Sequence, residues 1–157
     1  GYSSSDHITQ HSQWAQKVDE LLQSDAQIYI EIATEFNASS NSVTIETTTE
    51  ILESISAPLS LNVILTESHI IAYQTDYDAD PQEIADYEHN HVMRKSLTGS
   101  WGLDLGQSDY NNGDVISNTF SLTLEEDWLA ENISVVAFVS NTNTYQVIQA
   151  EETYIIE

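Results

Sequence analysis

Cysteine is absent from the 157 residues of this chain. A disulfide framework, a thiolate nucleophile and a zinc site with cysteine ligands are therefore all excluded. Proline and glycine are scarce, with 2 and 5 residues, and they do not cluster into a flexible linker. A chain of this length is typical of one domain with its own hydrophobic core. We therefore predict one folded domain over residues 27–157, preceded by an extension and helix over residues 1–26.

Basic side chains are just as scarce. Only Lys17, Arg94 and Lys95 oppose 26 Asp and Glu residues, which gives a formal net charge of -23. Nucleic acids and anionic membrane surfaces are bound through clustered Lys and Arg, so neither is an expected partner. The longest apolar run, near Val135–Val139, is far shorter than the roughly 20 residues that cross a bilayer, so we predict no direct membrane insertion. Cations and uncharged or basic surfaces remain as partners.

One short amphipathic helix is predicted near the N-terminus. Four apolar side chains are spaced at i, i+4, i+7 and i+8 and so share one helical face: Trp14, Val18, Leu21 and Leu22. Ser24 and Asp25 follow this pattern and are expected to end the helix. We expect the apolar face to dock on the segment that precedes or follows the helix.

From residue 27 the hydrophobic period changes to two, which is typical of half-buried strands. Seven or eight short runs rich in Ile, Val and Thr show this pattern: residues 28–33, 43–47, 59–65, 69–74, 87–97, 115–124, 133–140 and 145–156. Asn112-Gly113 is the one strong turn signal. The regular spacing predicts an all-β fold, an immunoglobulin-like antiparallel β-sandwich with the short helix at its N-terminal side.

Alternation along these runs also predicts the core. Each apolar set lies on one face of its strand, and that face is expected to point between the two sheets. The residues expected to be largely buried are Ile28, Ile30, Leu61, Val63, Phe120, Leu122, Val135 and Ala137.

An acidic segment in the middle of the chain is a candidate calcium site. Asp76, Asp78 and Asp80 occupy alternate positions, as in the opening of a calcium-binding loop, and Glu83 follows them. The known loop pattern then fails, because Pro81 stands where a glycine makes the sharp turn. Acidic runs in an acidic protein are commonly solvated loops. We keep these four carboxylates as candidate calcium ligands in another geometry and predict no other cofactor.

Catalytic signatures are missing. His89 and His91 flank Asn90 on a predicted strand, a spacing that places both imidazoles on one face and suits zinc or copper. Two ligands leave a site incomplete, so we predict that these histidines are structural or exposed. The chain has no G-x-S-x-G elbow, phosphate-binding glycine loop or dinucleotide fingerprint. We predict that the protein is not an enzyme; a metallohydrolase using the two histidines is the alternative, and it requires a third ligand.

The aromatic residues allow two interpretations. Trp14, Trp101 and Trp128 lie next to predicted element boundaries, where a large ring often closes the end of a sandwich, and we expect most aromatic side chains to belong to the core. The alternative is an exposed platform for sugar rings or peptides, because Trp and Tyr combine an apolar face with a polar tip.

Several sequence blocks resemble one known family. Y-E-H-N-H-V-M-R at residues 87–94 is followed by L-T-G-S-W-G at 97–102. Further blocks are V-I-L-T-E at 63–67, L-E-E-D-W at 124–128, V-V-A-F-V at 135–139 and V-I-Q-A at 147–150. Taken in their order along the chain, these blocks resemble the twenty-eight-kilodalton outer-membrane lipoprotein family of Bacteroidetes. The resemblance covers roughly residues 27–157.

This resemblance implies location at the cell outer membrane through a lipidated cysteine. That cysteine is missing, so we expect the anchor to lie in a part of the protein that is not present here. Many relatives resemble a thioredoxin-like region followed by an immunoglobulin-like domain, which makes residues 14–22 either the end of the first or the joint between them. The family supplies no catalytic residue to carry over.

The predicted function is a surface-exposed, non-catalytic interaction or spacer module of an outer-membrane lipoprotein, adhesin-like or receptor-like in role. Its expected partner is a protein or glycan at the cell surface. The leading alternative is a calcium-dependent or carbohydrate-binding β-sandwich module.

Overall fold

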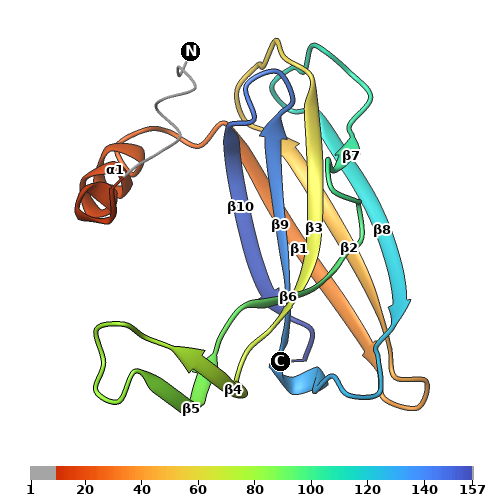
Figure 1. Ribbon diagram of the computed structural model, residues 1–157. Coiled ribbons are helices and arrows are strands. Elements are labelled where there is room, and N and C mark those ends of the chain that lie inside the picture. The colour runs from red at the N-terminus through yellow and green to blue at the C-terminus, as the bar shows by residue number, and fades with distance from the viewer. Residues whose placement is uncertain (1–9, 157) are drawn as a thin grey trace.

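The computed structural model describes residues 10–156. A short 3-10 turn, η1 (His11–Gln13), leads into helix α1 (Trp14–Leu21), which confirms the predicted helix. The hydroxyl of Ser24 donates to the Leu21 carbonyl at 2.7 Å, at the predicted end of the helix. The expected docking is not seen: Figure 1 shows α1 standing apart from the sheets, and its apolar side chains are exposed, Leu22 by 77%.

Two antiparallel sheets form the body of the molecule (Figure 1). The first has the order β1-β2-β8 and consists of β1 (Ile28–Asn37), β2 (Ser42–Ile51) and β8 (Val115–Thr123). The second has the order β10-β9-β3-β6 and consists of β10 (Val147–Tyr154), β9 (Ile133–Asn141), β3 (Leu59–Glu67) and β6 (Val92–Ser96). The two-residue strand β7 (Leu103–Asp104) also pairs with β3, and the 3-10 turn η2 (Ala130–Asn132) precedes β9. The predicted all-β antiparallel sandwich is confirmed.

A separate hairpin projects from the sandwich. It consists of β4 (Ile70–Thr75) and β5 (Glu83–His89), which pair only with each other among the described strands. The prediction of one strand over residues 87–97 was wrong, because β5 ends at His89 and β6 begins at Val92 in a different sheet. His91 has φ 53, a left-handed conformation that interrupts an extended chain. The break redirects the chain from the hairpin into the sandwich.

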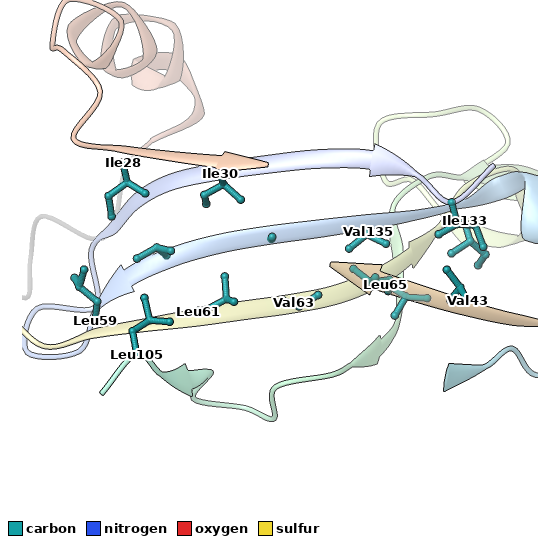
Figure 2. Close-up of a cluster of buried hydrophobic side chains, with 14 of the residues drawn as sticks. Ile28, Ile30, Val43, Leu59, Leu61, Val63, Leu65, Leu105, Ile133 and Val135 are labelled. Carbon is teal, nitrogen blue, oxygen red and sulfur yellow. The ribbon is translucent and has the colours of Figure 1, made fainter. Parts of the chain in front are cut away.

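The core lies between the two sheets, and Figure 2 shows the side chains that fill it. Six of the eight predicted core residues are at most 1% exposed: Ile28, Ile30, Leu61, Val63, Val135 and Ala137. Phe120 and Leu122 are only half-buried, although they pack against the same cluster. Both belong to β8, one of the two edge strands of its sheet. The other edge strand, β1, also contacts β9 and β10 of the second sheet, which keeps Ile28 and Ile30 buried.

Candidate functional site

The acidic segment lies in the loop that joins β4 to β5. The Asp76 carboxylate accepts a hydrogen bond from the Asp78 amide at 2.9 Å, and the Asp76 amide donates to the Gln82 carbonyl at 2.9 Å. Within residues 10–156, no group of three or more His, Asp or Glu side chains is placed to hold a metal ion. The structure therefore does not gather Asp76, Asp78, Asp80 and Glu83 into a set of ligands, and calcium binding stays a prediction.

His89 and His91 do not share a strand face. His89 is the last residue of β5, and its ring lies 4.8 Å from that of Tyr87 in an edge-to-face arrangement. His91 lies beyond the end of the strand, where its Nε2 is 3.3 Å from the Glu152 carboxylate on β10. The expected common face was wrong, because the chain turns between the two residues.

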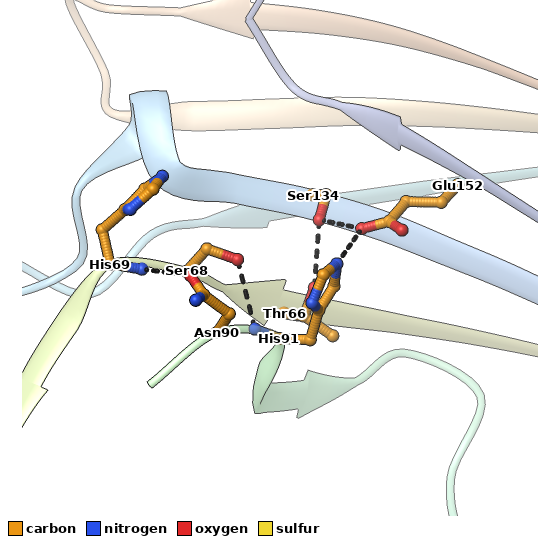
Figure 3. A network of polar contacts seen from close by, with 7 residues as sticks. All are labelled: Thr66, Ser68, His69, Asn90, His91, Ser134 and Glu152. Carbon is orange, nitrogen blue, oxygen red and sulfur yellow. Dashed lines mark hydrogen bonds and ion pairs between the residues drawn. The ribbon is translucent and has the colours of Figure 1, made fainter. Parts of the chain in front are cut away.

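The polar contacts around His91 clamp the base of the hairpin (Figure 3). The His91 amide donates to the Ser68 hydroxyl at 3.1 Å, and the His69 amide donates to the Asn90 side-chain carbonyl at 3.1 Å. Glu152, next to His91, accepts from the Ser134 hydroxyl at 2.5 Å. These contacts satisfy backbone and side-chain groups at the junction of hairpin and sandwich, which is a structural role.

An ion pair completes this junction. The Nε of Arg94 lies 2.7 Å from the Glu67 carboxylate, and the other Glu67 oxygen accepts from the Leu129 amide at 3.1 Å. The Arg94 guanidinium also lies 5.8 Å from the ring centre of Trp128, which is half-buried against the core as expected. Three of the blocks that carried the family resemblance thus meet at one place and hold the hairpin.

Tyr110 is buried in the core, but the other two tryptophans are not in the core. Trp101 and Tyr145 are 77% and 67% exposed, and their ring centres are 6.0 Å apart with the planes tilted by 46°. Trp14 is exposed as well. The expectation that these tryptophans close the ends of the sandwich was wrong for Trp14 and Trp101. Trp101 instead forms an aromatic pair with Tyr145 on the surface.

This pair borders a groove on the outer face of the second sheet. The groove has a volume of about 420 Å³. Its lining comes from β3, β9, β10 and the two connections that carry the rings: Ser60, Asn62, Ser100, Trp101, Phe138, Ser140, Thr142, Tyr145 and Val147. We call it the Trp101–Tyr145 groove. No charged side chain lines it.

Trp101 is positioned by the segment between β6 and β7, which runs along β3. The Leu97 amide donates to the Val63 carbonyl at 2.8 Å, and the Val63 amide donates to the Thr98 hydroxyl at 3.0 Å. Gly102 has φ +79, and a Cβ at this position would lie 2.9 Å from the Leu61 carbonyl oxygen. Only glycine permits this approach, so the Trp-Gly pair places the indole over the sheet beside β3.

Tyr145 is positioned by the tight connection between β9 and β10. Its amide donates to the Asn141 carbonyl at 2.7 Å, and the Asn141 side chain accepts from the Asn143 amide at 2.9 Å. The Thr142 amide donates to the Pro58 carbonyl at 3.0 Å, which ties the connection to the start of β3. Tyr145 has φ 59, a conformation uncommon for a bulky residue. Hydrogen bonds thus fix the connection at several points. The Tyr145 ring lies next to the Trp101 ring at the groove.

The floor of the groove is uncharged and places polar side chains beside Phe138 and Val147. The hydroxyls of Ser60 and Ser140 lie 3.1 Å apart on neighbouring strands. Asn62 lies two residues further along β3 and is only 9% exposed. Within residues 10–156 its side-chain amide has no hydrogen-bond partner. The amide nitrogen lies against Gly102, where an added Cβ would be 2.8 Å away, and the side chain lines the groove, so a bound molecule meets a group that can donate and accept.

Sequence reasoning identified only part of this site. Trp101 was among the aromatic residues considered for a platform, whereas Asn62 and Tyr145 were not singled out. Asn62 lies in an alternating strand pattern in which its type is ordinary, and Tyr145 lies in a polar turn. The W-G pair at residues 101–102 was noted only as part of the family resemblance, although a glycine beside a tryptophan is also a local signal of close backbone approach.

The fold and these contacts define a two-sheet β-sandwich with a projecting hairpin and an exposed aromatic groove. The family described as "Outer membrane protein Omp28" matches residues 3–157. The chain therefore belongs to the Omp28 family, which confirms the resemblance found in the sequence and the location at the outer membrane. No helix among residues 10–156 is long and apolar enough to cross a bilayer.

Two solved structures have a similar fold. A domain of the outer membrane lipoprotein Omp28 from Porphyromonas gingivalis has a TM-score of 0.54 and 22% sequence identity, covering 83% of this chain and 96% of that one. The sporulation control protein Spo0M from Bacillus subtilis has a TM-score of 0.53 and 12% identity, covering 83% of this chain and 49% of that one. At these identities both support the fold alone. No curated protein matches the chain.

Proposed function

We propose that this chain is a non-catalytic interaction module of a lipid-anchored outer-membrane protein, and that it contacts its partner through the Trp101–Tyr145 groove. The observation that carries the proposal is the pair of exposed rings above an uncharged floor that contains polar side chains. Exposed Trp and Tyr side chains in a concave surface are typical of binding sites, where they supply large contact areas at low cost in conformational entropy.

The other conspicuous polar groups support a binding role rather than a catalytic one. Glu67, Arg94, His91 and Glu152 are engaged in the contacts that hold the hairpin to the sandwich. The family description names an outer-membrane protein and no reaction. A spacer without a partner is the competing interpretation, and it gives the two exposed rings no role.

The test is an array of purified secreted proteins, matrix proteins and glycans, probed with the labelled full chain of 157 residues. We expect at least one partner to bind. Binding should weaken by about tenfold or more in the Trp101→Ala variant, because aromatic residues at the centre of an interface dominate its energy.

The matched control is Tyr77→Ala, which removes an aromatic ring that is 81% exposed in the hairpin loop, away from the groove. This variant should bind as the unchanged chain does. If no array member binds, or if Trp101→Ala binds as well as the unchanged chain, the proposal is overturned and the spacer interpretation gains support.

A further inference from the structure

We propose that the Trp101–Tyr145 groove binds a neutral sugar unit of a glycan, with the sugar ring packed against the two aromatic rings and its hydroxyls bonded to Asn62. This inference rests on the interaction function proposed above and names the ligand of the same site. Three independent properties of the groove support it: the aromatic pair, the unpartnered amide and the absence of charge in the lining.

The aromatic pair supplies an apolar surface that the described residues leave largely uncovered. Trp101 and Tyr145 expose 77% and 67% of their surface, and their planes are tilted by 46° rather than stacked on one another. Both rings line the groove, so a molecule bound in it contacts them. A pyranose ring has a face of C–H groups, and burying that face against the exposed aromatic rings is favourable.

The floor supplies hydrogen-bonding groups of both kinds. Asn62 is 9% exposed and its amide has no partner among the described residues, so a ligand that reaches it meets an unbonded group that can both donate and accept. Leaving such a group unbonded when a ligand excludes water costs free energy, which selects ligands that bond to it. Sugar hydroxyls both donate and accept. The Ser60–Ser140 contact uses only one of its two hydroxyl protons, so a further donor remains nearby.

The uncharged lining and the negative net charge of the chain favour neutral sugars over charged ligands that also present rings and polar groups. None of the nine lining residues is charged, whereas the whole chain carries -23. Nucleotides, sulfated glycans and uronic acids are repelled by this field and find no basic side chain in the groove. A neutral saccharide is not repelled by the negative field and needs no basic side chain for binding. A peptide has fewer hydroxyls to match the floor, and peptide binding is one of the outcomes of the test.

The dimensions and the rigidity of the groove also suit a small ring. Its volume of about 420 Å³ lies within the range of about 300–1,000 Å³ typical of small-molecule sites. The floor belongs to paired strands, and both ring-bearing connections are tied to the sheet by backbone hydrogen bonds. A site that is ordered before binding loses little entropy when a ligand enters.

The experiment follows the three tryptophan indole N–H signals of the full chain by nuclear magnetic resonance. The probes are neutral oligosaccharides of glucose, galactose, mannose and N-acetylglucosamine, an oligogalacturonate of equal length, and an unstructured Ser- and Tyr-rich peptide. We expect at least one neutral oligosaccharide to shift the Trp101 signal, assigned with Trp101→Phe, and not the Trp14 signal. The oligogalacturonate should bind about tenfold more weakly or not at all, because of like-charge repulsion.

The variants are chosen to leave the fold intact. Tyr145→Gly removes the ring and places glycine at φ 59, where it is better tolerated than tyrosine. Asn62→Ala removes the amide. Each should weaken binding of the neutral oligosaccharide by about tenfold, since each removes one of the contacts that select it. Tyr77→Ala, the control outside the groove, should leave the affinity unchanged.

The outcomes separate this inference from the function on which it rests. If a protein from the array or the peptide binds through Trp101 and no neutral oligosaccharide does, the sugar is excluded while the interaction module stands. If an oligosaccharide binds equally well to Tyr145→Gly and Asn62→Ala, the proposed site is wrong. If nothing binds through Trp101, both proposals fail together.

Discussion

Arg94 on β6 and Glu67 at the end of β3 form an ion pair of 2.7 Å, in which the Glu67 side chain is 3% exposed and the Arg94 side chain 25%. The same carboxylate accepts from the Leu129 amide beyond β8. One nearly buried charge therefore joins three parts of the chain at the point where the hairpin leaves the sandwich. Three of the family blocks, distant in sequence, therefore meet at this junction.

Removing Arg94 should destabilise the protein strongly. Arg94→Ala leaves the Glu67 carboxylate buried without its partner, and we expect the free energy of unfolding to fall by about 3 kcal/mol or more. Urea denaturation followed by circular dichroism measures the change. Lys95→Ala removes the same charge from the next, exposed residue and should cost less than about 0.5 kcal/mol. Equal losses in both variants would show that net charge, and not the ion pair, is responsible.

Gly102 should tolerate a methyl group much less well than Gly99. Both have positive φ, +79 and +75, but a Cβ on Gly102 would lie 2.8 Å from the Asn62 amide nitrogen and 2.9 Å from the Leu61 carbonyl oxygen, whereas Gly99 has nothing within 4 Å. We expect Gly99→Ala to cost about 1 kcal/mol from backbone strain alone, and Gly102→Ala on the order of 3 kcal/mol. Thermal melts of both variants measure the two losses of stability. Equal losses would contradict the close approach of the Gly102 backbone to β3.

Tyr110 should make the protein sensitive to alkali. Its side chain is buried, the hydroxyl donates to the Gln107 carbonyl at 3.0 Å, and burial raises the pKa of the phenol above its usual value. The unfolded chain releases this proton near pH 10 while the folded protein retains it, so stability falls as the pH rises from about 10 toward the folded pKa.

The Tyr110→Phe variant isolates this effect. At neutral pH it should lose about 1 kcal/mol with the hydrogen bond, and above about pH 10 its stability should fall less steeply than that of the unchanged chain. Urea denaturation between pH 8 and pH 11 gives both slopes. Parallel curves would show that Tyr110 is not the group that titrates.

Salt should stabilise this acidic protein by screening. With a net charge of -23, like-charge repulsion destabilises the compact state, and the screening length falls to about 10 Å at 0.1 M salt. We expect the melting temperature to rise with sodium chloride. If the acidic segment binds calcium as the sequence predicts, calcium at matched ionic strength should add a further rise, and that rise should disappear on changing Asp78 and Asp80 to Asn. No further rise in the unchanged chain would leave screening as the whole effect.

The strands and their buried faces were largely predictable because side-chain direction along a strand is set by local backbone geometry. Ile28 and Ile30, and Leu61 and Val63, point inward as their alternation requires. Residues 87–97 misled the prediction, since alternation does not show that His91 adopts a left-handed conformation and that the chain changes sheets there. The specifically immunoglobulin-like arrangement and a calcium site stay predictions.

The sequence by itself determined the all-β class, the acidic surface and the family, because composition, period and local motifs need no knowledge of distant contacts. Only the tertiary structure decided which aromatic rings are exposed. Trp101 meets Tyr145 because one connection runs along β3 and another joins β9 to β10 on the same sheet. Which side chains are exposed and which lie close together depends on the packing of segments far apart in the chain. A local sequence pattern does not predict that packing.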